Sequence, residues 1–296
     1  MQGPMPEPLP PVRLLGLREA LRTYVQALET QSTRLIRPLH WYMGNRLVIE
    51  GGFHPEDVTP RPPFRVESRG SGRTRSHLLI HDESVAGSGE HTIPGGLKTK
   101  QVDVTVSKPG IGPCVAVSVK GTVGAFRNLT NRMEEAIGDC TNLHISYPNL
   151  VYGFLHVIKA NLEGQRVQPN DVAVLPNGRI SDSIQRYHDA MAELTGRRGV
   201  RNDYTRYEAV ALVLASASGD AIGEVLPNFP TGDSRLGFAT FFETLYRTYD
   251  HRFVYAAPDL QRSTRRLEWD PTSPAIPVAR EFSIEARLSA GSAAEE

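Results

Sequence analysis

The sequence predicts an α/β domain in which helices flank a mixed central sheet. The runs 150–158 and 207–216 are almost wholly apolar, which is typical of strands buried on both faces in the middle of a sheet. The segments 102–107 and 115–120 instead alternate apolar and polar residues, as strands with one polar face do. Apolar residues recur at helical spacing in four other segments, namely 12–37, 127–139, 182–195 and 238–249. Helices and strands therefore alternate along the chain, which indicates a layered fold.

The bulk composition fits a single folded domain. The 296 residues are 40% hydrophobic and 22% charged, as in an ordinary globular protein. No linker divides the chain, so we expect one domain over 12–285, between a proline-rich disordered lead-in at 1–11 and a disordered tail at 286–296. Pro38 is predicted to end or kink the N-terminal helix, and the C-terminal addition after Trp269 is predicted to be irregular.

Charge and cysteine content exclude few functions. Lys and Arg together number 33, as do Asp and Glu, so the net charge gives no sign of a polyanionic partner, although a binding surface needs only local charge. Cys114 and Cys140 lack metal-ligand spacing, so we expect buried free thiols in a reducing compartment. No run approaches the roughly 18 apolar residues of a membrane span. The N-terminus lacks the pattern of a signal peptide. A cytoplasmic protein with no membrane partner is therefore expected.

The segment 54–75 is predicted to be an irregular loop rich in proline and arginine. A mobile loop of this kind can follow nucleic-acid phosphates. A solvated surface loop whose arginines pair with nearby acids fits the sequence equally well. The arginines in question are Arg61, Arg65, Arg69, Arg73 and Arg75.

The strongest local pattern is a predicted hairpin formed by 102–107 and 115–120. The Pro/Gly-rich segment between them is a strong turn signal. If the hairpin is symmetric about this turn, Asp103 lies directly opposite Ser118, and Lys120 lies one pair further on. Cross-strand neighbours are roughly 5 Å apart at Cβ, so a carboxylate and an ammonium group would share one small polar site.

A site of this kind has the parts that phosphodiester hydrolysis requires. Metal-assisted hydrolysis needs carboxylate oxygens, a positioned water and a cation near the charge that develops on phosphorus. Asp103 can supply a carboxylate and Lys120 a cation, but Ser118 stands where a second acid would be expected. Glu134 lies fourteen residues after Lys120 on the predicted following helix, and its carboxylate can replace the missing one. Glu135 is equally able to turn inward.

These residues together resemble the PD-(D/E)xK nucleases, and more narrowly the type II restriction enzymes that cut around a CCGG core. In that subgroup the second metal-binding acid has moved from the strand to the following helix and has left a Ser-x-Lys motif behind. The resemblance covers roughly residues 98–160. It implies a restriction-endonuclease-like core, with the catalytic positions taken by Asp103, Ser118, Lys120 and Glu134.

The resemblance also implies a cofactor, partners and roles for these residues. Asp103 and Glu134 would hold Mg²⁺, with the backbone carbonyl of Val119 as a further ligand. Lys120 would position the attacking water, and Ser118 would be a neighbour of the metal, not a ligand. Enzymes of this kind cut both strands of double-stranded DNA by pairing two active sites, so a homodimer or tetramer is expected.

The chain departs from the subgroup between the lysine and the glutamate, in the segment that reads bases. Two of the expected arginine positions are occupied, but Gly124 and Phe126 stand where another arginine and an acid would be. A CCGG target therefore does not follow. The candidate base readers are Arg127, Asn128 and Arg132, because such side chains can bond to base edges. Candidate phosphate contacts are Arg69, Arg73 and Arg75, together with the basic residues of 197–206.

Several alternatives remain open on the sequence. Asp103 and Lys120 can form a structural ion pair at a sheet surface, and Glu134 and Glu135 can simply face water. The same fold can serve in repair or in defence without sequence preference. A non-catalytic DNA-binding protein on a decayed nuclease fold is also consistent with Ser118. The histidines show no zinc-ligand spacing, and no G-x-S-x-G elbow occurs.

Overall fold

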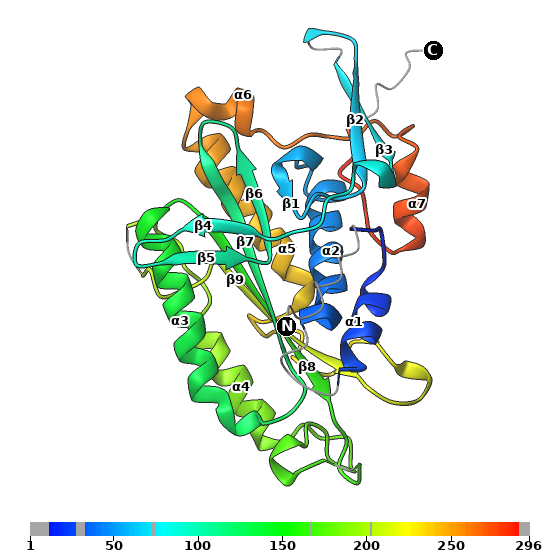
Figure 1. Cartoon of the computed structure of the whole chain (residues 1–296), viewed down its shortest axis with the longest axis vertical. Helices are drawn as coiled ribbons and strands as arrows, with labels where there is room; N and C mark the ends of the chain where they lie inside the picture. Colours follow the sequence, from blue (N-terminus) through cyan, green and yellow to red (C-terminus); the bar gives the residue numbers. More distant parts are fainter. Residues whose placement is uncertain (1–11, 28–32, 73–74, 166, 202, 290–296) are drawn as a thin grey trace, which may run out of the picture.

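A mixed five-stranded sheet forms the centre of the molecule, with helices on both faces (Figure 1). The computed structural model describes residues 12–27, 33–72, 75–165, 167–201 and 203–289. Strand order in the sheet is β1-β6-β7-β8-β9, with β1–β6 and β6–β7 antiparallel and the remaining pairs parallel. The α/β class with a mixed sheet is thereby confirmed. The strands are β1 (Val58–Thr59), β6 (Val104–Lys108), β7 (Gly112–Thr122), β8 (Val151–Ala160) and β9 (Ala209–Ser216).

The two faces of the sheet carry separate cores. One core packs α1 (Leu17–Val25), α2 (Thr33–Ile49) and α5 (Phe238–Tyr249) against the sheet. The other packs α3 (Leu129–Ser146) and α4 (Asp182–Glu193) against the opposite face. The apolar runs predicted as central strands are β8 and β9, and both are buried along nearly their whole length. No helix of the described residues is long and apolar enough to cross a membrane.

The register of the predicted hairpin is confirmed. Val104, the first residue of β6, pairs with Val117 of β7. Extending this register by one residue places Asp103, just before β6, opposite Ser118. A bulge between Val106 and Ser107 shifts the register nearer the turn and brings Lys108 opposite Gly112. From Val115 onward the side chains of β7 alternate, so the odd-numbered residues face α2 and α5 and the even-numbered ones face α3. Cys114, nearer the bulge, lies with the core on the α2 and α5 side.

The N-terminal helical segment differs from the prediction. It forms two helices, α1 and α2, and α2 continues through Pro38 without ending there. A proline inside a helix costs roughly 3 kcal/mol. The buried side chains of Leu39, Met43 and Leu47 on the same helix offset that cost by packing against the sheet. Of the two predicted outcomes, an end or a kink at Pro38, the end does not occur, and His40 lies on a helix that faces the core.

The segment 54–75, predicted to be an irregular loop, contains a 3-10 helix at Pro55–Asp57, the strand β1 and the first strand of a hairpin. β2 (Phe64–Arg69) pairs along its whole length with β3 (Ser76–His81), and the two strands project together from the body of the molecule (Figure 1). A second small hairpin, β4 (His91–Pro94) with β5 (Thr99–Val102), precedes Asp103. Arg61 pairs with Glu56 at 3.2 Å, and Arg65 pairs with Asp82.

The C-terminal region is more ordered than predicted. It contains the helix α7 (Ala275–Glu281), and Trp269 is completely buried. The first residues of the predicted disordered tail are bonded to the body, because the N–H of Arg287 donates to the carbonyl of Ile49 at 3.0 Å. The predictions for 1–11 and 290–296 fall outside the described residues. Cys114 and Cys140 are buried free thiols, as expected.

Candidate active site

Asp103 occupies the break between β5 and β6, where the chain leaves the β4–β5 hairpin and enters the central sheet. Its side chain is 12% exposed. Oδ2 accepts a hydrogen bond of 2.7 Å from the backbone N–H of Val119 on the neighbouring strand. A charge-assisted bond to a backbone N–H fixes the rotamer of the carboxylate. Oδ1 is left to face the space beside the sheet.

Lys120 lies on the same strand as that N–H donor, one residue further along β7. Its Nζ is 4.0 Å from Oδ2 of Asp103, and about a third of its side chain is exposed (34%). An ion pair this long and this accessible contributes little to stability. The ion pair matters because it shows that the carboxylate of Asp103 and the ammonium group of Lys120 lie close together, as predicted.

Ser118 supplies no charge to this site. Its Oγ lies 3.1 Å from the hydroxyl of Tyr152, and the side chain is 2% exposed. Ser118 is therefore a buried residue bonded to a tyrosine, and its expected place next to a metal stays a prediction. Val119 contacts Asp103 through its amide nitrogen, whereas the prediction for this residue concerned its carbonyl oxygen.

The two glutamates of α3 face different ways. Both glutamates are exposed, but Glu135 lines a narrow pocket with Ser118 and Lys120, whereas Glu134 does not line it. The reason lies in the phase of the helix, because successive residues of an α-helix are separated by about 100°. The inward polar stripe of α3 consists of residues spaced by three or four positions, Arg132, Glu135 and Asp139. Ile137, which the sequence predicted to lie on the core face, is 37% exposed.

Ion pairs hold the acids of this stripe. Asp139 pairs with Lys100 of β5, and Glu135 lies 3.3 Å from Arg132. His156 of β8 lies beside Lys120 in the parallel register and lines the same pocket. Burial, followed by the charges of Arg132 and Lys120, lowers the pKa of His156 to about 3, so this imidazole is neutral at pH 7.

Two further polar side chains, those of His40 and Glu90, lie close to Asp103. Ligand atoms of His40, Glu90 and Asp103 all lie within 4.8 Å of one another. His40 comes from α2 and Glu90 from the loop before β4, so three distant segments converge here. Burial lowers the pKa of His40, and burial followed by the charge of Asp103 raises the pKa of Glu90. The imidazole is therefore a neutral nitrogen donor.

These residues fit a divalent cation. His40 Nε2 is buried and has no hydrogen-bond partner among the described residues, and it lies 3.8 Å from Oδ1 of Asp103. A cavity of about 110 Å³ lies beside the cluster. One imidazole nitrogen and two carboxylates form a common donor set for divalent metals. The predicted pairing of Asp103 with Glu134 differs from this arrangement, because Glu134 is not part of the cluster.

The sequence carried no signal for His40 or Glu90. His40 stands beside Trp41 and Tyr42 in a segment whose composition indicates only packing. Glu90 lies in a glycine-rich stretch that has no recognisable motif. Positions 40, 90 and 103 have no fixed spacing, so only the folded arrangement brings them together. Sequence reasoning therefore located the carboxylate at the centre of the site but missed two of its neighbours.

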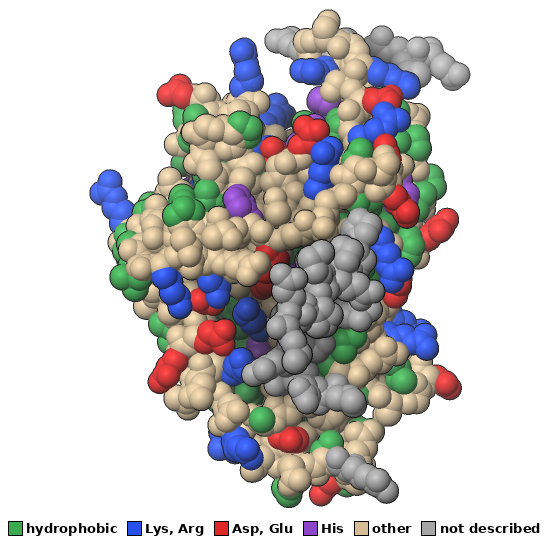
Figure 2. Space-filling model, in the orientation of Figure 1, with side chains coloured by type: hydrophobic (Ala, Val, Ile, Leu, Met, Phe, Trp, Pro, Cys, Tyr) green, Lys and Arg blue, Asp and Glu red, His purple; other side chains and the backbone are tan. Residues whose placement is uncertain are grey.

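The predicted DNA-binding residues are divided between surface and interior. Arg127 and Asn128, which precede α3, are exposed, as are Arg69 at the end of β2 and Arg75 before β3. Arg132 faces the pocket of Lys120. Arg73 lies outside the described residues. Basic and acidic side chains are interspersed over the face that Figure 2 shows, in keeping with the zero net charge.

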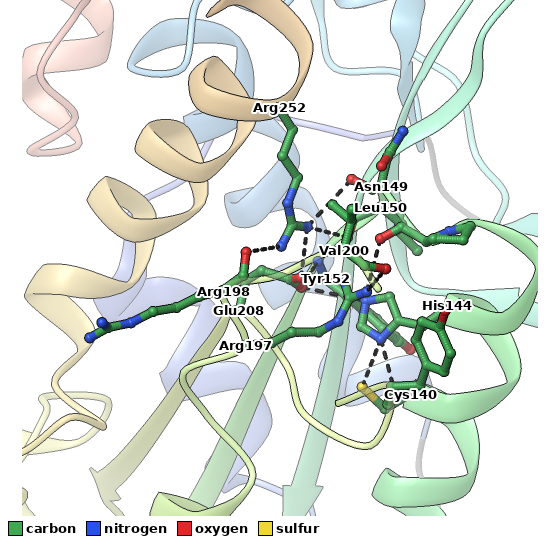
Figure 3. Close-up of polar contacts among 12 residues, drawn as sticks. Cys140, His144, Asn149, Leu150, Tyr152, Arg197, Arg198, Val200, Glu208 and Arg252 are labelled. Atoms are coloured by element: carbon green, nitrogen blue, oxygen red, sulfur yellow. Dashed lines mark hydrogen bonds and ion pairs between the residues drawn. The ribbon is translucent and has the colours of Figure 1, made fainter. Parts of the chain in front are cut away.

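Arg197 does not face phosphates, contrary to prediction. It is 3% exposed, and its Nη1 lies 2.7 Å from Oε1 of the buried Glu208. Arg252 reaches the same oxygen at 2.7 Å, and the N–H of Tyr152 donates to Oε2 (Figure 3). An arginine in such a network cannot leave it without stranding a buried carboxylate. Another of the predicted phosphate contacts, Arg206, pairs with Asp203 at 3.0 Å.

Comparison of the chain with protein-family models, with curated proteins and with solved structures found no match.

Proposed function

We propose that this chain is a metal-dependent endodeoxyribonuclease that hydrolyses phosphodiester bonds of double-stranded DNA at a specific site, as a type II restriction enzyme does. The observation that carries the proposal is the environment of one carboxylate. Oδ2 of Asp103 accepts from Val119 N–H at 2.7 Å and has the Lys120 ammonium at 4.0 Å. Oδ1 of the same group faces His40 at 3.8 Å. Fixed carboxylate, cation and metal-binding donors thus meet at one point.

Each residue of this constellation has a distinct task in the proposed reaction. Asp103, together with neighbouring donors, holds a divalent ion, which when bound supplies charge neutralisation at the scissile phosphate. Lys120 orients the attacking water and offsets negative charge that develops in the transition state. Val119 keeps the Asp103 carboxylate in one orientation through its N–H.

Recognition of DNA is assigned to exposed side chains near this site. Arg127 and Asn128 lie on the surface at the start of α3, within eight residues of Lys120 along the chain. Arginine and asparagine make bidentate contacts with guanine and adenine edges. Arg69 and Arg75 extend from the β2–β3 hairpin and are assigned to phosphates. Cutting both strands calls for two active sites, hence a homodimer or tetramer.

Two alternatives are distinguished by the products. A nuclease of the same kind in repair or in non-specific defence would leave heterogeneous ends, whereas a restriction enzyme leaves one reproducible end. A non-catalytic DNA-binding protein is favoured by one observation, the hydrogen-bonded Ser118 at the position of the second acid. Such a protein would bind DNA without cutting it.

The test is cleavage of phage and plasmid DNA with Mg²⁺ or Mn²⁺, followed by sequencing of the ends. We expect wild type to cut and Lys120→Met to lose at least about 10²-fold in rate. Lys98→Met is the matched control, because Lys98 is exposed at the tip of the β4–β5 hairpin. Its backbone carbonyl bonds to Asn142 of α3 and not to Asp103. Absence of cutting by wild type would refute the nuclease, and an unchanged rate in Lys120→Met would refute the assignment of Lys120 to the active site.

A further inference from the structure

The group formed by His40, Glu90 and Asp103 was not anticipated from the sequence. We propose that these three residues form a divalent metal site that binds Mn²⁺ in preference to Mg²⁺, and that Glu134 has no part in it. This inference deepens the proposed nuclease function, because it names the ion and the ligands of the same site.

The distances suit ligands of one ion. Bonds of about 2.1 Å place two ligands of one ion at most about 4.2 Å apart. His40 Nε2 and Asp103 Oδ1 are 3.8 Å apart, which is too far for a hydrogen bond but within that limit. The whole set of donor atoms lies within 4.8 Å, so small rotations of the side chains bring all three to an ion.

His40 gives an independent indication of a ligand. Its ring is 4% exposed, and Nε2 has no hydrogen-bond partner in the described part of the chain. A buried polar atom left without a partner costs about 1–3 kcal/mol. An ion between His40 and Asp103 would satisfy that atom, since the neutral nitrogen carries a lone pair.

The surroundings hold the ligands in place. Val119 N–H bonds to Oδ2 of Asp103, so Oδ1 remains available, which is the arrangement that orients metal-binding carboxylates. The loop that carries Glu90 is tied down by a hydrogen bond of 3.0 Å from Gly87 N–H to the carbonyl of Arg61. His40 is fixed by its position on α2.

The cavity provides room for the remaining ligands. It measures about 110 Å³ and is lined in part by Ser88, Glu90 and Gln101. One water needs roughly 10–15 Å³ of space of this kind, so the cavity has room for water. Three protein donors with waters would complete an octahedral shell.

The donor set determines the preferred ion. Mg²⁺ takes oxygen ligands almost exclusively, whereas imidazole nitrogen favours transition metals. Mn²⁺, like Mg²⁺, binds carboxylate oxygens and prefers octahedral coordination. A site with one imidazole and two carboxylates therefore favours Mn²⁺.

The experiment is titration of the full-length chain with MnCl₂ in the absence of DNA, with free Mn²⁺ followed by electron paramagnetic resonance. We expect one Mn²⁺ per chain in wild type, displaced only by a large excess of Mg²⁺. Glu90→Gln and His40→Gln should each weaken binding by about 10- to 100-fold. Glu134→Gln is the matched control and should bind as wild type does. A thermal melt of each variant separates loss of binding from loss of the fold.

Three outcomes would overturn the inference: no stoichiometric Mn²⁺ in wild type, unchanged binding in folded Glu90→Gln, or weakened binding in Glu134→Gln. These outcomes are separate from failure of the nuclease proposal. A wild-type chain that binds Mn²⁺ through Glu90 and yet cuts no DNA refutes the nuclease and supports the metal site. A chain that cuts DNA while Glu90→Gln retains full Mn²⁺ affinity refutes the metal site alone.

Discussion

The backbone N–H of Val119 donates a 2.7 Å hydrogen bond to Oδ2 of Asp103, so the strand that carries Lys120 also orients the carboxylate beside it. This bond crosses from β7 to the break between β5 and β6. The relative positions of Asp103 and Lys120 are therefore set by the sheet and do not depend on their own long ion pair of 4.0 Å. Functional groups held in this way need little rearrangement before reaction.

Arg132 is expected to affect the rate of cleavage, and Arg127 the choice of sequence. Arg132 lines the pocket with Lys120, so Arg132→Gln removes a cation near the reacting phosphate and should lower the single-turnover rate by about 10²-fold with the cut sequence unchanged. Arg127 is exposed, so Arg127→Gln should relax the sequence requirement at one position. Sequencing of the cut ends beside rate measurements checks both. Altered ends from Arg132→Gln with an undiminished rate would reverse these roles.

His156 is expected to make the fold sensitive to acid. Burial is the main reason that its pKa is lowered to about 3, against 6.5 for an ordinary histidine. Between these values the unfolded chain binds a proton that the folded chain does not, so stability falls as the pH falls from about 6.5 towards 3. His156→Gln, which can keep the bond to Thr122, removes this term.

The measurement is urea denaturation of both proteins at pH 7 and pH 5. Wild type should lose about 2 kcal/mol more than His156→Gln over this interval, because each pH unit below 6.5 contributes at most about 1.4 kcal/mol. Equal losses in the two proteins would show that His156 is protonated in the folded state.

Glu208 is expected to be essential for stability. Its carboxylate is fully buried, forms ion pairs with Arg197 and Arg252, and accepts a hydrogen bond from the N–H of Tyr152 (Figure 3). Burial alone would raise the pKa of Glu208, but the imidazole of His144, 3.5 Å away, and the charge of Arg252 outweigh burial and lower that pKa. Glu208→Gln leaves two buried guanidinium groups without their counter-charge and should cost about 3–5 kcal/mol of unfolding free energy.

Glu193→Gln provides the control for that measurement. Its side chain is 81% exposed and lies 3.8 Å from Arg206, so its removal should change the unfolding free energy by no more than about 0.5 kcal/mol. A loss in Glu208→Gln as small as that in Glu193→Gln would mean that the network contributes nothing to the fold.

Local patterns were sufficient to predict the hairpin and its register. Alternation of valines with polar residues defines both strands, and symmetry about the turn predicts the pairing of Val104 to Val106, although a bulge shifts the register nearer the turn. The helix predicted from residue 182 is likewise found as α4, and the Oγ of Ser181 accepts from Ile184 N–H at its start. The closeness of Asp103 and Lys120 followed from this register alone.

Other features depended on tertiary contacts that a pattern does not reveal. Glu134 and Glu135 are adjacent on α3, so their side chains point about 100° apart around the helix axis. Which of them turns inward depends on the rotation of the helix, and the burial of Ala136 and Cys140 sets that rotation. The path of α2 through Pro38 depends on the core that this helix covers. Arg197 is buried because Glu208, eleven residues away, offers it a counter-charge, which residue type alone does not indicate.

The most direct test of the proposed active site is the isosteric substitution Asp103→Asn, measured by cleavage of plasmid DNA with Mn²⁺. The substitution keeps the oxygen that can accept from Val119 N–H and removes the charge shared by Lys120 and the metal ligands. We predict that wild type cuts the DNA and that Asp103→Asn, folded as judged by its thermal melt, cuts at least about 10³-fold more slowly. Cleavage by folded Asp103→Asn at the wild-type rate would contradict the assignment of this carboxylate to the active site.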